Sequence, residues 1–301
     1  MFQRSFTGGN FQFTLDGSDD TGYVKSITGG YIKGEVASEQ AGPSALQYRH
    51  VATVDIEPIT VDLGMALSYR MIDWIRDSWS RKYSRRNGHV GHGDFDRHAQ
   101  LEQHFTNALL IETTFPALDA TSKEPLYMSA KILPETIEVK AGSGRLTGLI
   151  GSKQKLWVAN SFAVNIDGVD CAGGVNKVDA FTIKQKHKKF HYGSARLPQV
   201  EPTGIEFPNL VLYVSLARAK PFFDWHNEYV VRGRRDTAME KTGEIVYRGP
   251  NGDDLLTIKL SGVGITAVSV DKSEANSDKI KMAKVELFVE SMDIEDKFGL
   301  E

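Results

Sequence analysis

The sequence predicts a mainly β protein made of two tandem antiparallel β-sandwich or barrel modules, each with one packed helix. Three observations lead to this prediction. The chain of 301 residues repeats itself at an offset of 151. The repeated segments alternate apolar and polar residues, as half-buried strands do, and each copy contains one stretch with helical spacing instead. A chain of this length is also long enough for two domains.

The repeat begins with the opening strand of each copy. NFQFTLDG at 10–17 aligns with SFAVNIDG at 161–168, and both end in Asp-Gly, a turn dipeptide. A second strand is expected at 23–33 and at 175–184, and a third at 53–63 and at 205–216. Because one offset links all these segments, we interpret them as copies of one module.

Helical spacing follows in each copy. In MALSYRMIDWIRDSW the apolar residues recur at threes and fours, and ARAKPFFDWHNEYVV repeats the pattern. Asp-Trp occupies the same point of both segments, at 73–74 and 224–225. Since an indole buries a large apolar area, we expect Trp74 and Trp225 to anchor each helix on its sheet.

Strands resume after each helix, at 105–115 and 127–139 in the first copy. In the second copy they are expected at 244–248, 254–260, 265–271 and 280–292. Here the offset becomes 155, and we expect the extra residues in SEANSDKI, 273–280. The modules then cover 1–145 and 154–301, joined by a linker of about 140–153 that is rich in Gly, Ser and Lys.

Composition narrows the classes of function. The net charge is −3, so no global basic field exists for wrapping nucleic acid. The single cysteine, Cys171, excludes an intrachain disulfide and fits a reducing compartment. No apolar run has the length of a signal peptide core or a bilayer span. We therefore expect synthesis in the cytoplasm and no membrane partner.

One segment has the residue types of a metal site. GHVGHGDFDRH, 88–98, contains His89, His92, Asp94, Asp96 and His98. Their spacing matches no familiar site, so a solvated glycine-rich loop is the preferred interpretation. No phosphate-binding loop or nucleophile motif occurs elsewhere. We therefore predict no catalytic residues, no cofactor and no enzymatic activity.

The stretches between the second and third strands differ between the copies, and we expect both to be irregular. The first, GEVASEQAGPSALQYR, is small and polar, whereas the second, QKHKKFHYGSARLPQ, is basic with aromatic residues. Nucleic-acid contact is one interpretation of the second stretch, and a partner-facing loop is the preferred one. The candidate interface residues are Lys184, Lys186, Lys188, Lys189, Phe190 and Arg196.

The order of these elements resembles the tail tube protein family of contractile-tailed phages and related contractile injection systems. The resemblance is carried by the Asp-Gly opening strands, by MIDWI and FFDWH, and by the hairpin EIVYRGPNGDDLLTIKLSGV at 244–263. It continues through the Asp/Ser segments LDATSKE and VDKSEANSDK into the closing strand KVELFVESMDI. The first copy departs from the family in its histidine-rich segment, and the family's usual single unit is doubled here.

The resemblance implies a structural virion protein of the tail, assembled in the host cytoplasm. Its subunits would form rings that stack around a lumen, through which genomic DNA passes during ejection without specific binding. Its partners would be other copies of the chain, the tail sheath, the baseplate or hub and the tape measure protein. A ring would contain three chains with pseudo-six-fold symmetry, our preference, or six chains. The variable stretches would be arms that reach the neighbouring ring.

Three alternatives stay open. The chain could be a tube initiator or baseplate hub, which would stop at one ring. It could be a two-domain β-sandwich binding protein, for instance one that binds carbohydrate, which would be monomeric. An enzyme using the His/Asp segment at 88–98 ranks last.

Overall fold

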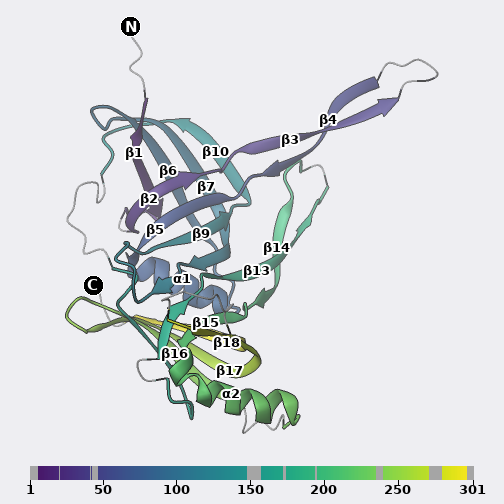
Figure 1. Cartoon of the computed structure of the whole chain (residues 1–301). Coiled ribbons are helices and arrows are strands. Elements are labelled where there is room, and N and C mark those ends of the chain that lie inside the picture. The colour runs from purple at the N-terminus through teal and green to yellow at the C-terminus, as the bar shows by residue number, and fades with distance from the viewer. Residues whose placement is uncertain are drawn as a thin grey trace.

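The computed structural model describes residues 6–19, 21–40, 42, 47–147, 157–171, 174–193, 195–234, 240–270 and 280–296. These residues form two antiparallel sheets, one above the other in Figure 1, and a two-stranded hairpin that extends from the upper sheet. The mainly β fold with two tandem modules is thus confirmed. Among the described residues, no helix is long and apolar enough to cross a membrane.

The first sheet is built mostly from the first half of the chain. Its main path runs β1 (Phe6–Leu15), β6 (Arg86–Asp94), β7 (Ala99–Phe115), β9 (Tyr127–Leu133), β5 (Ile59–Leu67) and β2 (Gly22–Thr28). A further strand, β10 (Thr136–Ala141), pairs with β7.

The second sheet repeats this order. It runs β11 (Phe162–Ile166), β16 (Lys241–Arg248), β17 (Asp254–Val270), β18 (Met282–Asp296), β15 (Leu210–Ser215), β12 (Val175–Val178) and finally β8 (Leu118–Asp119), which comes from the first half of the chain.

Strand registers also repeat between the sheets. Val24 of β2 faces Leu63 of β5, and Val175 of β12 faces Val214 of β15, each residue 151 positions later. After the helices the offset is 155. Leu110 of β7 faces Ile132 of β9, and the residues 155 positions later, Ile265 of β17 and Leu287 of β18, also face each other. Both of these latter pairs are followed by a bulge.

The offset changes before β16. The first pair of β16 and β17, Lys241 opposite Val263, already lies 155 positions after the pair Arg86 opposite Ala108 in the first module. The expectation that the extra residues lie in 273–280 was therefore wrong. They lie between the end of η2 (Asn227–Val231), which corresponds to the end of the first module's helix, and β16.

The variable stretches are hairpins rather than irregular loops, which corrects the sequence prediction. The first is formed by β3 (Ile32–Gln40) and β4 (Gln47–Ile56), and the second by β13 (Phe181–Phe190) and β14 (Gln199–Glu206). The two share a register, including one bulge. The β3–β4 hairpin projects as an arm at the upper right of Figure 1, whereas β13–β14 lies along the first module.

Backbone breaks separate each hairpin from its sheet. The strand expected at 23–33 ends at Thr28, because Gly29 and Gly30 have φ of 88° and 77°. A Cβ at Gly29 would lie 2.1 Å from the carbonyl oxygen of Pro58, so only glycine fits there. The strand expected at 53–63 is likewise divided at Pro58, which has no N–H for a ladder bond.

Each module has one main helix. Ser68 caps α1 (Tyr69–Trp79) by accepting a bond from the Met71 N–H, so this helix begins later than the sequence pattern predicts. In the second module a 3₁₀ turn, η1 (Leu216–Arg218), leads into α2 (Lys220–His226). A π-helical turn, η2 (Asn227–Val231), follows α2. Figure 1 shows α1 between the two sheets and α2 on the far side of the second sheet.

Candidate functional site

The two modules are joined edge to edge by backbone pairing. Strand β13 of the second module runs antiparallel to the end of β7 in the first, from Phe181 opposite Phe115 to Lys184 opposite Glu112. Just beyond β7, Leu118 and Asp119 of β8 pair with β12. We call this contact the joint. It places β13 on the end of β7, which extends beyond the pairing of β7 with β6, so that two otherwise unpaired strand edges are paired.

Apolar side chains fill the joint. Val200 of β14 is buried in one cluster with three residues of the first module, namely Leu109, Ile111 and Leu133. The rings of Phe115 and Phe181 stack with their centroids 5.3 Å apart. The Trp79 ring of α1 meets Phe207 of the second module edge-on, with centroids 6.4 Å apart. The modules therefore share a hydrophobic core.

Polar side chains close the rim of the joint. The Arg85 guanidinium donates to the carbonyl oxygen of Val200 at 2.5 Å and to Glu135 at 2.6 Å. From α1, the Ser78 hydroxyl donates to Oε1 of Gln185 at 2.7 Å, and both side chains are buried. Buried polar groups paired in this way fix the relative position of the two modules.

The predicted interface residues lie on the β13–β14 hairpin. Lys184, Lys186 and Lys188 are exposed on β13, and Lys186 pairs with Glu206 at 3.0 Å. Lys189 forms an ion pair with Asp55 of β4, so this lysine contacts the first module of its own chain. Phe190 and Arg196 are exposed towards the tip.

The two predicted helix anchors are both buried. Trp74 is fully buried, and its indole N–H donates to the carbonyl oxygen of Ser84 at 2.8 Å. Trp225 is 6% exposed, and its indole N–H has no hydrogen-bond partner among the described residues. The preceding residues face outward, because Asp73 pairs with Arg86 and Asp224 with Lys220.

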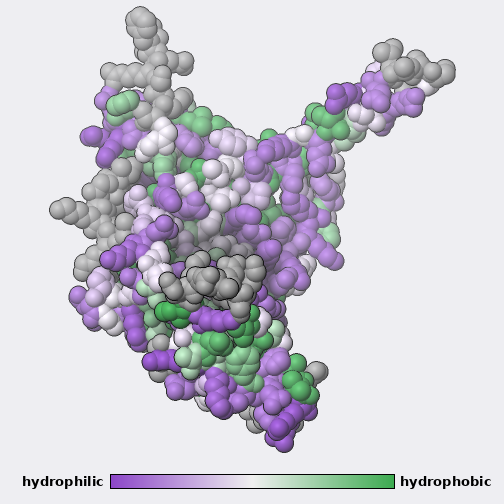
Figure 2. All heavy atoms as spheres, in the orientation of Figure 1, coloured by the Kyte–Doolittle hydropathy of each residue, from purple (hydrophilic) through white to green (hydrophobic). Residues whose placement is uncertain are grey.

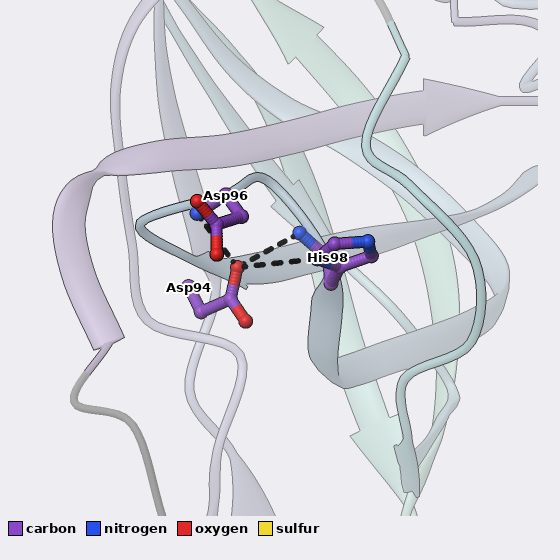
Figure 3. A group of neighbouring side chains, drawn as sticks. All are labelled: Asp94, Asp96 and His98. Atoms are coloured by element: carbon purple, nitrogen blue, oxygen red, sulfur yellow. Dashed lines mark hydrogen bonds and ion pairs between the residues drawn. The ribbon is translucent and has the colours of Figure 1, made fainter.

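The segment 88–98 is not the solvated loop that the sequence predicts. It forms β6, paired with β1 and β7, and then a tight turn. His89 and His92 lie on the strand, whereas Asp94, Asp96 and His98 gather at the turn (Figure 3). The glycines permit this strand: a Cβ at Gly88 would lie 2.1 Å from the carbonyl oxygen of Thr14.

The cluster at this turn is explained by backbone hydrogen bonding. Oδ1 of Asp94 accepts the N–H groups of Asp96 and His98 at 2.9 and 3.0 Å (Figure 3). Its other oxygen, Oδ2, accepts from the Gln100 side chain at 3.0 Å. One side-chain oxygen or ring nitrogen from each of Asp94, Asp96 and His98 lies within 4.8 Å of the other two, which is close enough to share a cation. The buried carboxylate is already bonded as a turn-forming side chain.

The structure also brings together two histidines, His89 and His104, whose proximity the sequence does not predict. His89 faces His104 across β6 and β7, and their rings stack with centroids 5.0 Å apart. His89 Nδ1 lies 2.7 Å from the Thr14 hydroxyl, and His104 Nε2 lies 2.8 Å from Glu102. Burial, reinforced by the positive charge of His104, lowers the pKa of His89. Only the strand register brings these rings together, so no spacing in the sequence indicates the pair.

Cys171 has the properties of a structural residue. It is buried, and burial raises the pKa of its thiol to about 11. A thiol with such a pKa is protonated at neutral pH and is a weak nucleophile.

Comparison with known proteins adds a family match. Residues 158–293 match the family model described as T4-like virus tail tube protein gp19. No curated protein matches the chain.

Three solved structures illustrate the similarity to known folds. In the extended sheath-tube complex of PVC, an extracellular contractile injection system, a chain is 18% identical with a TM-score of 0.41. The match covers 51% of the present chain and 99% of that chain. A chain of the anti-feeding prophage tube-terminating cap is 14% identical with a TM-score of 0.40, covering 47% and 94%. Hcp1 from Flavobacterium johnsoniae is 12% identical with a TM-score of 0.27, covering 46% and 99%.

The family match spans nearly the whole second module, from before β11 to the last residues of β18. It confirms the resemblance noted in the sequence: the second module is similar to the family described as T4-like virus tail tube protein gp19.

Proposed function

We propose that the chain is a structural subunit of the tail tube of a contractile tail, and that its modules form rings that stack around a lumen. The second module has the family match, and the first module has the same strand order and registers. Both modules would therefore have the same structural role.

The joint is the observation that carries this proposal. Two tube modules of one chain already meet edge to edge through β7 and β13. A ring requires one such contact repeated around an axis, and here a single chain contains one instance. This arrangement supports two modules side by side in one ring rather than in successive rings. Three chains would then make a ring of six modules.

The remaining parts of the proposal follow from the family role. The stacked rings would guide genomic DNA, and a chain with a net charge of −3 would not hold it tightly. The sheath, baseplate and tape measure protein would be its partners. No catalytic role is proposed, because the 88–98 cluster is accounted for by a turn.

Electron microscopy of the purified full chain tests the proposal. A tube subunit should form rings with three chains each and, at high concentration, stacked cylinders. A hub or initiator should stop at single rings. A particle that stays monomeric at every concentration, with one chain by mass, would contradict the tube role and favour the two-domain binding protein.

A further inference from the structure

The chain contains a second, unfilled version of the joint. Strand β3 is the counterpart of β13, and the end of β17 is the counterpart of the end of β7, because strand order and register repeat. β3 pairs only with β4, and β17 beyond Val263 pairs only with β18, among the described residues. Each chain therefore has one free edge of each kind.

Side-chain exposure marks the same two edges. Residues that are buried in the joint have exposed apolar counterparts at the free edges. Ile183 of β13 is 2% exposed and its counterpart Ile32 of β3 is 48% exposed, and Phe115 of β7 is 0% exposed and its counterpart Val270 of β17 is 44% exposed. Figure 2 also shows hydrophobic side chains at the surface over β16, β17 and α2. Exposed apolar residues in strand-edge positions indicate a surface that another chain covers.

A hollow lies beside the free edge of β17. It has a volume of about 390 Å³ and is lined by Tyr229, Val230, Ile265, Thr266 and Phe288. In the joint, the corresponding position is filled by Val200, packed against Ile111 and Leu133, the counterparts of Thr266 and Phe288. The hollow is thus the vacant form of the site that Val200 occupies.

The residue that would fill this hollow is an arginine. In the β13–β14 hairpin, Val200 faces Lys189, and in the β3–β4 hairpin Arg49 faces Ser38 at the same register. Arg49 is exposed near the outer part of the free arm. The hollow suits it, because two aromatic residues line it, Tyr229 and Phe288, with ring centroids 6.2 Å apart, and a guanidinium is attracted to aromatic rings.

The charged residues at corresponding positions of the two modules also differ. In the joint, Arg85 pairs with Glu135 at 2.6 Å next to Val200. Strand registers give Glu240 and Glu290 as the counterparts of these two residues. Next to Val200, the first module therefore has an arginine–glutamate ion pair with no net charge. At the corresponding positions the second module has two carboxylates, which would attract the positively charged Arg49.

We propose that these surfaces are the two halves of one contact between copies of the chain. The β3 edge of one copy pairs with the β17 edge of the next, with Ile32 opposite Val268 and Arg49 seated in the hollow beside Glu240 and Glu290. The inference rests on the proposed tube function. It adds that an arginine and two carboxylates stabilise the contact between chains, at the position where the apolar Val200 packs in the contact within a chain. Such a head-to-tail contact can close into a ring.

Charge reversal tests the arginine. Arg49→Glu should weaken self-association at least about tenfold, since it sets a third carboxylate beside two others. Glu290→Arg should weaken it similarly, and the double variant Arg49→Glu/Glu290→Arg should restore association. Arg70→Glu, at an exposed position of α1, is the matched control. Sedimentation velocity at two salt concentrations measures association, and the wild type should dissociate as salt rises.

Cysteine pairing tests the register. Directly opposed residues on antiparallel strands lie within disulfide range. Ile32→Cys/Val268→Cys should therefore give covalent multimers under mild oxidation, whereas Tyr31→Cys/Val268→Cys should give few. Wild-type assembly that is unaffected by Arg49→Glu, with no Ile32–Val268 cross-link, overturns this interface and leaves the tube function standing. A wild-type chain that never associates overturns both.

Discussion

Phe115 in the first module stacks on Phe181 in the second, with centroids 5.3 Å apart and an angle of 14° between the ring planes. The two residues also face each other across the β7–β13 strand pair. Backbone pairing and ring packing thus act at one point, so the two modules should unfold as a coupled pair rather than as independent domains.

Phe181→Ala should destabilise the whole chain. The side chain is 4% exposed and packs against Phe115, which is fully buried, so truncation removes apolar contacts and leaves a cavity at the joint. Substitutions of this kind cost about 3–5 kcal/mol. Urea unfolding followed by circular dichroism should show the loss. The transition should also broaden or divide in two as the modules uncouple.

Phe190→Ala is the control for this experiment. Phe190 lies on the same strand but is 40% exposed, so its truncation should cost under about 1 kcal/mol. Equal losses from the two substitutions would show that the joint does not hold the modules together.

Trp74→Phe should be more harmful than Trp225→Phe. Both indoles are buried, but only Trp74 donates to a carbonyl, that of Ser84. Phenylalanine keeps most of the ring volume and leaves the Ser84 carbonyl oxygen without its donor, at a cost of about 1–3 kcal/mol. At Trp225 no such bond is lost. Chemical denaturation of the two variants measures the difference, and similar losses would argue against a specific role of the Trp74 bond.

The sequence predicted the parts of the fold that depend on local pattern and repetition. The Asp-Gly strand ends, the helix around each Asp-Trp pair and the offsets of 151 and 155 all appear in the structure. Alternation of apolar residues is visible in one sequence because each strand buries one face.

The joint could not be predicted in the same way. β13 carries exposed lysines on its outer part, so its polar composition resembled a loop. Its strand character comes from pairing with β7 and β14, which are distant in sequence. The segment 88–98 was misread for a similar reason: its glycines fit close approaches between neighbouring backbones, which only the tertiary structure reveals.

Asp94→Ala should destabilise the first module independently of any metal. The carboxylate accepts two backbone N–H groups and one side-chain N–H, so its removal leaves buried donors unpaired at a cost of about 1–3 kcal/mol. Asp94→Asn keeps one oxygen acceptor and should lose less. Thermal unfolding of both variants, with and without EDTA, checks this. Wild-type protein that loses stability when EDTA is added would instead indicate a bound cation.

The stability of the first module should fall as the pH drops from about 7 to 5. Burial and the charge of His104 lower the pKa of His89 below its ordinary value of 6.5 in the folded chain. The unfolded chain therefore binds more protons below that pH, and the contribution of neutral His89 is fully present above pH 6.5 and is lost as pH falls towards the folded pKa. Since His89 is only half-buried, the loss should be under about 1 kcal/mol.

The pair His89→Gln and His191→Gln isolates this effect. Glutamine can still bond the Thr14 hydroxyl but cannot take up the proton, so His89→Gln should flatten the dependence of the unfolding free energy on pH between 7 and 5. His191 is exposed at the end of β13, and its substitution should leave the slope unchanged. Denaturation curves at several pH values give the slopes. Parallel slopes for the wild type and His89→Gln would mean that the stacked histidine pair does not set the acid sensitivity, because the protons would then be taken up elsewhere in the chain.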